Sequence, residues 1–600
     1  MRYTGFIPVR EGMLMKYRVR PTLRLFAALL AALLLTGSFT PASAASLPSG
    51  IEKGSIGGEI EQFVADHADT TAGMAVAVFD RDGMIYENSF GYADVENGVA
   101  VDADTVFEWG STTKLTVWVS VMQLWEQGKI DLNADIRTYL PEGFLTNLRF
   151  DEPVTMLHLM NHNAGFQEVL TDLFLPEGSE IPDLASALAL HKPEQIYAPG
   201  TVTAYSNWGA ALAGYIVERV SGEAYSDYVH EHIFSPLGIE HTAIRPDLSD
   251  NPWVQEQRKE LRCYTADVRP MEPDFYYISL YPAGMCTGTI SDFSAFAQAL
   301  LTEDCPLFDS PDTWHALFTP TASFGDTGIP RTSHGFWTLP YGVNVVGHGG
   351  NTAGCSSYLL LDLEDGVGSV VMTNQSGESV YNTELMELIY GSIRGADYDV
   401  PPQGVYRSAR TILSGPLKLY SVGYTIFTSD DLEEFYSLRS ENGLTVVSYP
   451  YSDMLQIPAG TLVLELGLLL LWVVGTLFSL LYLLSWPVGW VFRKITHRDK
   501  TITRRIRLRR AAALLHLAVL GLLAASVFRL LTYAPGGSYR WMPLYLVIGI
   551  AMAILLVLML FSHEEDRNKK ETALTAVTLI FLLAAIGNMI YWQLYMFWIF

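Results

Sequence analysis

Ser111 and Lys114 stand three residues apart in the run Ser-Thr-Thr-Lys, directly before an apolar helical pattern over residues 115–125. At the start of a helix these two side chains share one face. A serine hydroxyl is a weak nucleophile until a base takes its proton, and a partly desolvated lysine on the same face can take it or hold another base as an anion. The pair therefore indicates attack by Ser111 on an acyl carbon, although taken alone it is more typical of an N-cap serine followed by a solvated lysine.

A second segment, Tyr205-Ser206-Asn207, follows the turn sequence Pro199-Gly200-Thr201. A tyrosine near an ammonium group can be pushed toward phenolate and then act as a general base for Ser111. Asn207 offers an amide that can hold a substrate carbonyl or the lysine. In isolation the segment is also typical of a loop tyrosine and a capping asparagine before the helix expected over residues 208–221.

A third segment, His348-Gly349-Gly350-Asn351, falls on a predicted strand. Glycines let a substrate backbone lie along a strand edge, so His348, Gly349 and Gly350 are assigned with Asn207 to substrate binding. The backbone N–H groups of Ser111 and Asn351 are the two candidate donors of an oxyanion hole. The alternative is a strand-end turn with an exposed histidine.

The order and flanks of these segments resemble the serine penicillin-recognising family, in the branch that contains class C β-lactamases, serine D,D-peptidases and related esterases. The resemblance covers roughly residues 55–395. It implies Ser111 as nucleophile, Lys114 and Tyr205 handling its proton, an acyl-enzyme, no cofactor, and peptidoglycan stem peptides, β-lactams or small esters and amides as substrates. The supporting segments are Phe107-Glu108-Trp109-Gly110, residues 154–165, Pro236-Leu237-Gly238-Ile239, Ala283-Gly284-Met285 and Thr373-Asn374.

The chain departs from this family at the third segment, because it has no Lys-Thr-Gly. His348 carries less positive charge than a lysine at neutral pH, so strong β-lactam turnover is not expected. Ser249-Asp250-Asn251 also matches a middle motif of related enzymes and stays a second candidate beside Tyr205. Tyr86-Glu87-Asn88 has the Tyr-x-Asn pattern but precedes the nucleophile on a predicted hairpin strand.

Metal chemistry is not expected from this sequence. His158 and His162 stand four residues apart, as zinc ligands on a helix can, but no glutamate follows His158. The resemblance implies that this helix is structural. Gly-x-Ser-x-Gly, the nucleophile turn of α/β-hydrolases, does not occur in the sequence.

The elements that must position these groups follow from the hydrophobic pattern. Strands are expected over residues 74–79 and 84–92 around an Asp-Gly turn, and again over residues 343–374. Helical patterns dominate residues 111–300. The expected fold is α/β (α+β), β-lactamase/transpeptidase-like: one antiparallel sheet completed by distant segments, with flanking helices and a mostly helical insertion. This domain is assigned to residues 45–400.

The last quarter of the chain reads as a membrane domain. Its connecting loops set the orientation, because residues 493–510 hold nine Lys/Arg and one Asp and should be cytoplasmic, which places residue 461 outside. The ionisable residues within the spans stand near span ends, so anchoring, oligomerisation or signalling is favoured over transport. Within residues 459–600 the expected spans are about 462–484, 511–531, 543–562 and 574–596.

The N-terminus agrees with this orientation. Basic residues between positions 16 and 24 precede an apolar run over residues 25–35, and Ala42-Ser43-Ala44 offers a cleavage site. Residues 1–44 are therefore assigned as a signal peptide, with an uncleaved anchor as the alternative. Residues 401–458 are expected to be an extracytoplasmic linker or small module, and no chemistry is assigned to them.

The charge of the chain narrows the classes of partner that it can bind, whereas its cysteines leave the disulfide pairing open. Residues 45–458 hold 57 acidic and 19 basic residues, which disfavours nucleic-acid binding. The sequence does not choose among the pairings of Cys263, Cys286, Cys305 and Cys355, and it leaves the oligomeric state open. The expected function is an extracytoplasmic bacterial serine hydrolase in the cell membrane, facing peptidoglycan peptides or small acyl substrates. The alternatives are an idle β-lactam or wall-fragment sensor and a small-molecule or lipid esterase.

Overall fold

The computed structural model describes residues 45–146, 148–169, 171, 173–190, 192–324, 328–393, 402–427, 437–441, 443–497, 502–532, 540–562 and 569–599. The predicted signal peptide, residues 1–44, lies outside the described residues. The globular domain named below comprises the described residues between 46 and 393.

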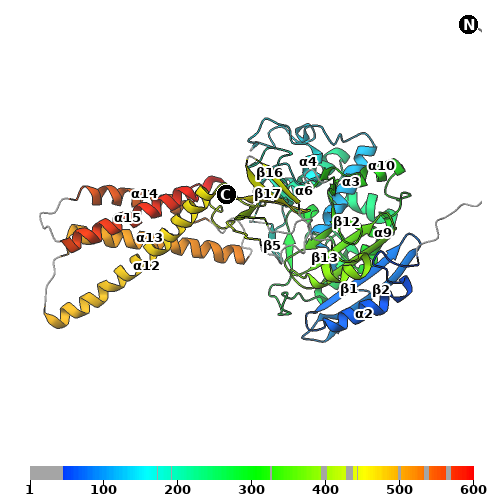
Figure 1. Ribbon diagram of the computed structural model, residues 1–600, viewed down its shortest axis with the longest axis horizontal. Coiled ribbons are helices and arrows are strands. Elements are labelled where there is room, and N and C mark those ends of the chain that lie inside the picture. Colours follow the sequence, from blue (N-terminus) through cyan, green and yellow to red (C-terminus); the bar gives the residue numbers. More distant parts are fainter. Residues whose placement is uncertain are drawn as a thin grey trace, which may run out of the picture. The chain divides into compact units, whose positions relative to one another are not determined.

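The globular domain is built on a nine-stranded sheet of order β3-β2-β1-β14-β13-β12-β11-β10-β9, in which every pairing is antiparallel (Figure 1). The early strand β1 pairs with the late strand β14, with Val76 opposite Val371. The expected completion of one sheet by distant segments is therefore confirmed. The strands are β1 (Gly73–Asp80), β2 (Gly83–Asp94), β3 (Val99–Ala100), β9 (Ala322–Ser323), β10 (Pro330–Ser333), β11 (Phe336–Pro340), β12 (Asn344–Asn351), β13 (Ser356–Asp362) and β14 (Val367–Thr373).

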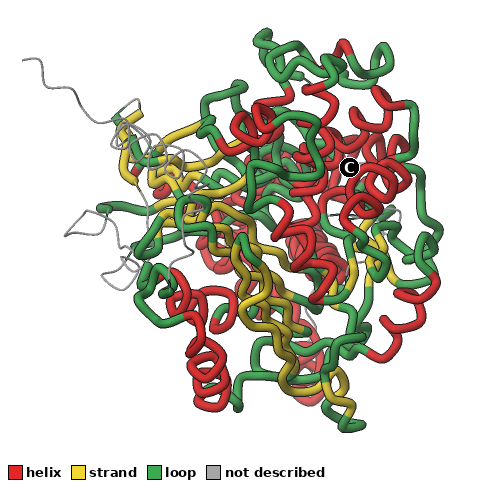
Figure 2. The backbone as a smooth tube through the Cα atoms, turned by 90° about the vertical axis from the view of Figure 1, so that its right-hand side faces the viewer, coloured by secondary structure: helices red, strands yellow, loops and turns green. Residues whose placement is uncertain are grey.

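Helices cover both faces of this sheet (Figure 2). Because side chains alternate along a strand, Ala75, Ala77 and Phe79 join the larger core, whereas Met74 and Val76 join the smaller one. Helices α2 (Ile56–Asp66) and α11 (Leu385–Tyr390) supply the smaller core. The remaining helices of the domain are α3 (Lys114–Glu126), α4 (Met156–Met160), α5 (Leu184–Leu190), α6 (Asn207–Ser221), α7 (Tyr225–Val229), α8 (Pro252–Gln257), α9 (Ile290–Ala299) and α10 (Pro311–Phe318).

Helix α3 is buried all round, from Lys114 to Leu124, so it runs through the larger core. A preceding 3-10 turn, η2 (Gly110–Thr113), leads into it. Short strands outside the main sheet are β4 (Phe107–Glu108), β5 (Phe174–Pro176), β6 (Thr242–Ala243), β7 (Tyr276–Ile278) and β8 (Thr287–Gly288).

The described residues between 402 and 458 contain a four-stranded sheet of order β15-β18-β17-β16. A connecting segment, residues 409–418, follows β15 and has contacts at both ends. Near its start, the N–H of Ala409 donates to the Asp453 carbonyl at 2.8 Å. Near its end, the Lys418 ammonium donates to the Tyr591 carbonyl at 3.1 Å. The strands are β15 (Tyr406–Ser408), β16 (Ser437–Glu441), β17 (Leu444–Ser448) and β18 (Asp453–Gln456).

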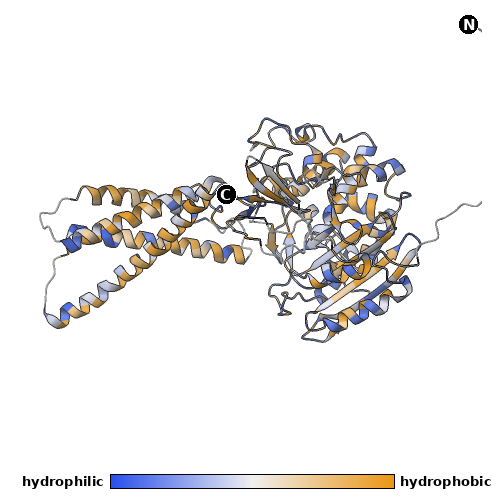
Figure 3. Cartoon of the chain, viewed as in Figure 1, coloured by the Kyte–Doolittle hydropathy of each residue, from blue (hydrophilic) through white to orange (hydrophobic). Residues whose placement is uncertain are grey.

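Four C-terminal helices are long and apolar enough to cross a membrane, as Figure 3 shows by their colour. The first extends past the expected span, because its basic residues Arg493 and Lys494 continue the helix after the apolar run ends. The helices are α12 (Ala459–Thr496), α13 (Arg504–Leu531), α14 (Pro543–Leu560) and α15 (Lys569–Tyr591).

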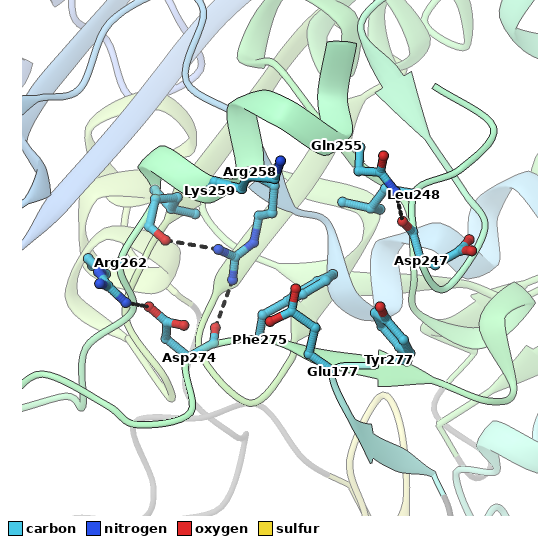
Figure 4. A pocket seen from close by; sticks show the side chains of 11 residues that line it. Glu177, Asp247, Leu248, Gln255, Arg258, Lys259, Arg262, Asp274, Phe275 and Tyr277 are labelled. Atoms are coloured by element: carbon cyan, nitrogen blue, oxygen red, sulfur yellow. Dashed lines mark hydrogen bonds and ion pairs between the residues drawn. The ribbon is translucent and has the colours of Figure 1, made fainter. Parts of the chain in front are cut away.

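A buried ion pair joins Arg258 to Glu108, which precedes the Ser111 turn. Their side chains are 5% exposed each, and the closest N···O distance is 2.7 Å. Arg258 also donates to the carbonyls of Leu261 and Asp274 (Figure 4). The cavity of about 440 Å³ that Arg258 lines contains none of the three predicted motifs.

Replacing Arg258 by leucine should lower the free energy of unfolding by about 3–5 kcal/mol, because the Glu108 carboxylate would stay buried without its partner. Chemical denaturation of the full chain in detergent, followed by tryptophan fluorescence, measures the loss. Arg262→Leu is the matched control: its side chain is 52% exposed and pairs with Asp274, so about 0–1 kcal/mol is expected. Equal losses in the two variants would contradict the buried pair's role.

Candidate active site

Lys114 brings Ser111 and Asn207 together. Its Nζ lies 3.0 Å from Ser111 Oγ, 2.8 Å from Asn207 Oδ1 and 2.5 Å from the Ala283 carbonyl oxygen. Burial lowers the pKa of Lys114 well below its usual value, and the positive charge of Arg410 adds to this. A lysine with a lowered pKa, in contact with a serine hydroxyl, is suited to take the serine's proton.

Ser111 is fixed by the turn that carries it. The Trp109 N–H donates to the Cys286 carbonyl at 2.7 Å, and the Cys286 N–H donates to Thr113 Oγ1 at 3.0 Å. These two hydrogen bonds connect the residues on both sides of Ser111 to Cys286, three residues after Ala283. The hydroxyls of Thr112 and Ser357 both donate to the Trp109 carbonyl.

The two predicted oxyanion-hole donors lie on backbones that approach each other closely. A Cβ atom on Gly350 would lie 2.0 Å from the Trp109 carbonyl oxygen and 3.1 Å from the Ser111 nitrogen. A Cβ atom on Gly110, which has φ +54°, would lie 2.6 Å from the Asn351 nitrogen. Only glycine at positions 110 and 350 therefore lets the nucleophile turn meet strand β12.

Tyr205 lies at the same group, directly before α6. Lys114 Nζ is 4.8 Å from the centroid of its ring. Burial raises the pKa of Tyr205, and the opposing influence of the Ser111 hydroxyl and of Arg410 is smaller. This direction favours a protonated phenol over phenolate at Tyr205 in the free site, because desolvation outweighs the nearby positive charge.

His348 is buried rather than exposed, and its ring stacks on Trp337 with centroids 3.8 Å apart. Its Nδ1 lies 2.6 Å from the Gly349 carbonyl oxygen. Burial and the charge of Lys114 lower the pKa of His348 to about 3. The imidazole is therefore neutral at physiological pH and supplies no positive charge for an anionic substrate.

Two residues at the site were missed in the sequence. Arg410 comes from residues 401–458, to which no chemistry was assigned, and its guanidinium carbon lies 4.9 Å from the centroid of the Tyr205 ring. It forms an ion pair with Glu168. His162 lies with its ring centroid 4.4 Å from that of Tyr205, and its Nδ1 accepts a hydrogen bond from the Ser206 N–H. A histidine within the motif-rich segment 154–165 was a signal for the second residue, whereas the sequence around Arg410 offers none.

The competing motifs have structural partners elsewhere. Asp250 accepts hydrogen bonds from the Ile244 and Arg245 N–H groups, and Asn251 caps α8. His158 completes the capping box of α4 with Thr155. The sites of Ser111 and of Ser249-Asp250-Asn251 are therefore different, and the structure places Tyr205 rather than Ser249 beside Lys114.

The cysteines are all free and buried in the structure. Cys263 Sγ and Cys355 Sγ lie 3.9 Å apart, and with Glu108 they form one of two groups among the described residues whose ligand atoms are close enough to hold a metal ion. Arg258 already pairs with Glu108 at that place. Neither group contains His158 or His162.

Comparison with known proteins gives a consistent result. The family model described as beta-lactamase matches residues 60–389. Penicillin-binding protein 4 of Amycolatopsis lactamdurans is 28% identical over 340 residues, which are 54% of this chain and 86% of that protein. Penicillin-binding protein 4* of Bacillus subtilis (strain 168) is 23% identical over 360 residues, or 57% and 77% of the two chains.

Among solved structures, the octameric penicillin-binding protein homologue from Pyrococcus abyssi superposes with a TM-score of 0.47 at 19% identity, covering 65% of this chain and 87% of that one. The family model alone spans more than half of the 600 residues and contains all three motifs. The chain therefore belongs to the beta-lactamase family, whose members are serine hydrolases such as β-lactamases and D-alanine carboxypeptidases.

Proposed function

We propose that the protein is a membrane-anchored serine hydrolase that forms an acyl-enzyme on Ser111 and acts on peptidoglycan peptides or related amides and β-lactams. The observation that carries this proposal is the 3.0 Å contact of Lys114 Nζ with Ser111 Oγ, inside a group that also holds Asn207. Membership of the family supports the same class of reaction.

In the proposed reaction Ser111 Oγ attacks the acyl carbon while Lys114 takes its proton. The N–H groups of Ser111 and Asn351 stabilise the oxyanion. Tyr205, protonated in the free site, passes a proton to the leaving group as the carbon–nitrogen or carbon–oxygen bond breaks, and Lys114 then returns the proton that it took from Ser111 to the Tyr205 oxygen. Water then attacks the acyl carbon, which releases the acid and restores the Ser111 hydroxyl. Asn207, whose Oδ1 is held by Lys114, has its amide NH₂ left to orient the substrate together with strand β12 around His348.

We assign the globular domain to the outer side of a bacterial cell membrane, with the four helices crossing it. The signal-like pattern of residues 1–44 and the basic loop 493–510 support this topology. Helices of sufficient length and hydropathy are present in the described residues.

A second candidate is a sensor that binds wall fragments or antibiotic without turnover. The contacts of residues 409–418 with both Glu168 and the end of α15 favour it, since the segment connects the site with the helices. The acylation experiment separates the two candidates.

Ser111→Ala should abolish covalent labelling of the full chain by a fluorophosphonate probe and by a fluorescent penicillin, because among the described residues Ser111 supplies the one hydroxyl that is hydrogen-bonded to Lys114 Nζ. Intact mass and timed release of the label measure the effect. Ser249→Ala, in the competing serine motif, should label as the wild type does. Labelling by the fluorophosphonate alone would favour an esterase, and no labelling of the folded wild-type protein would favour the sensor.

Lys114→Arg should slow acylation by about 10²–10⁴-fold, because a guanidinium keeps the charge but cannot accept the proton. In the wild type the acylation rate should rise with pH through the lowered pKa of Lys114 and then level off, since only the neutral amine can take the proton. Stopped-flow labelling across pH checks both statements. Lys129→Arg, on an exposed lysine three residues after the end of α3, is the matched control, and a pH-independent wild-type rate would contradict the assignment of Lys114 as base.

Tyr205→Phe should lower kcat by about 10²–10⁴-fold for an amide substrate, and by less for an ester with a good leaving group, because only the amide nitrogen needs a proton to depart. Parallel kinetics with an amide and an ester of the same acyl group measure the difference. Tyr92→Phe, on an exposed tyrosine, controls for the loss of a hydroxyl. Equal losses for both substrates would assign Tyr205 to a step before the leaving group departs.

A further inference from the structure

Among the described residues around Lys114 and Tyr205, Arg410 is the one exposed side chain with a permanent positive charge. Lys114 is fully buried and surrounded by three oxygen acceptors. His348 is fully buried, stacked on Trp337 and neutral. Arg410 differs from both, because its side chain is 41% exposed while its guanidinium lies over the Tyr205 ring.

Much of the hydrogen-bonding capacity of Arg410 is free. Its Nε donates to Glu168 Oε2, and the described part of the chain offers its two terminal nitrogens no hydrogen-bond partner. An arginine has five N–H donors in a planar fork that matches a carboxylate in two-point contact. The terminal nitrogens can therefore take a second anion while Glu168 keeps the side chain in place.

The backbone of Arg410 is held on both sides, so its place at the site is built rather than incidental. The Tyr197 hydroxyl donates to the Ala409 carbonyl at 3.3 Å. The Glu168 N–H donates to the Thr411 carbonyl at 3.1 Å, and Gln167 Oε1 accepts from the Leu413 N–H at 3.2 Å. These bonds position a residue that lies beyond the 60–389 region matched by the family model.

We propose that Arg410 is a specificity-determining residue that binds a carboxylate of the substrate next to the scissile bond. The inference rests on the proposed function, because it takes the Ser111 group to be an acyl-binding site. It narrows the substrates to anionic acyl compounds such as peptides with a free C-terminal carboxylate. The cation would come from residues 401–458 rather than from strand β12, where His348 is neutral.

Glu168 sets how strongly the site binds such an anion. Its carboxylate neutralises part of the Arg410 charge and competes with an incoming carboxylate for the guanidinium. Removing that charge while keeping Arg410 should therefore preserve or strengthen the preference for an anionic ligand.

The test is the affinity of the full chain in neutral detergent for an N-acylated dipeptide of D-amino acids with a free C-terminal carboxylate, compared with the same dipeptide as its amide. Titration calorimetry on the Ser111→Ala background gives the ratio of the two Kd values without turnover. The carboxylate should bind more tightly, and Arg410→Gln should lower that preference by about 10- to 100-fold. Arg410→Lys keeps the charge but loses the planar fork of N–H donors, so its preference for the carboxylate should lie between those of the wild type and of Arg410→Gln.

Two matched variants complete the design. Arg219→Gln removes an exposed charge near the end of α6 and should leave the ratio unchanged, and Glu168→Gln should keep or raise it. A wild-type protein without a preference for the carboxylate, or an Arg410→Gln protein of unchanged melting temperature that keeps the full preference, would overturn the proposal. Because the ratio is a binding measurement, it is independent of the labelling of Ser111: a folded wild-type protein that is not labelled overturns the hydrolase proposal, whereas a wild-type protein without a preference for the carboxylate overturns this one.

Discussion

The buried Nζ of Lys114 is the contact on which the rest of the site depends. An amine removed from water has a lowered pKa, and its N–H groups are costly to bury unless oxygen atoms surround them. Its three acceptors come from segments far apart in the chain, at Ser111, Asn207 and Ala283. The packing of each segment must therefore hold its oxygen atom within hydrogen-bonding distance of Lys114 Nζ.

The packing around the lysine meets this demand with close backbone approaches. Gly214 of α6 lies against Pro282, where a Cβ atom would come within 2.7 Å of the proline ring. Gly350 of β12 lies against the Trp109 carbonyl in the same way. The close backbone contacts that allow Lys114 to reach its partners are thus accompanied by those that bring the Ser111 and Asn351 N–H groups near each other.

Much of this arrangement could be predicted from the sequence because it depends on local patterns. The Asp-Gly turn after Asp80 fixed the first hairpin, and spacing placed Ser111 and Lys114 on adjacent turns of one helix start. The completion of one sheet by distant segments could be predicted from the order of strand and helix patterns. The pairing of β1 with β14 in particular could not, since no local signal joins strands almost 300 residues apart.

Burial and long-range contacts could not be read from the sequence in the same way. The proton affinity of Tyr205 follows from desolvation by the surrounding core, which a motif does not encode. Arg410 reaches the site through long-range contacts: β15 pairs with β18, and Arg410 pairs with Glu168. A single arginine in a segment without a recognisable motif does not indicate that it contacts Glu168 and Tyr205.

The connecting segment limits how far apart two regions of the protein can lie. The Gly415 N–H donates to Gln593 Oε1 at 2.8 Å, only five residues after Arg410. Five extended residues span at most about 18 Å. As long as the Gly415–Gln593 and Arg410–Glu168 contacts persist, the Tyr205 ring and the Lys114 group beside it therefore stay close to the C-terminal end of α15, and the site cannot move far from that end of the four helices.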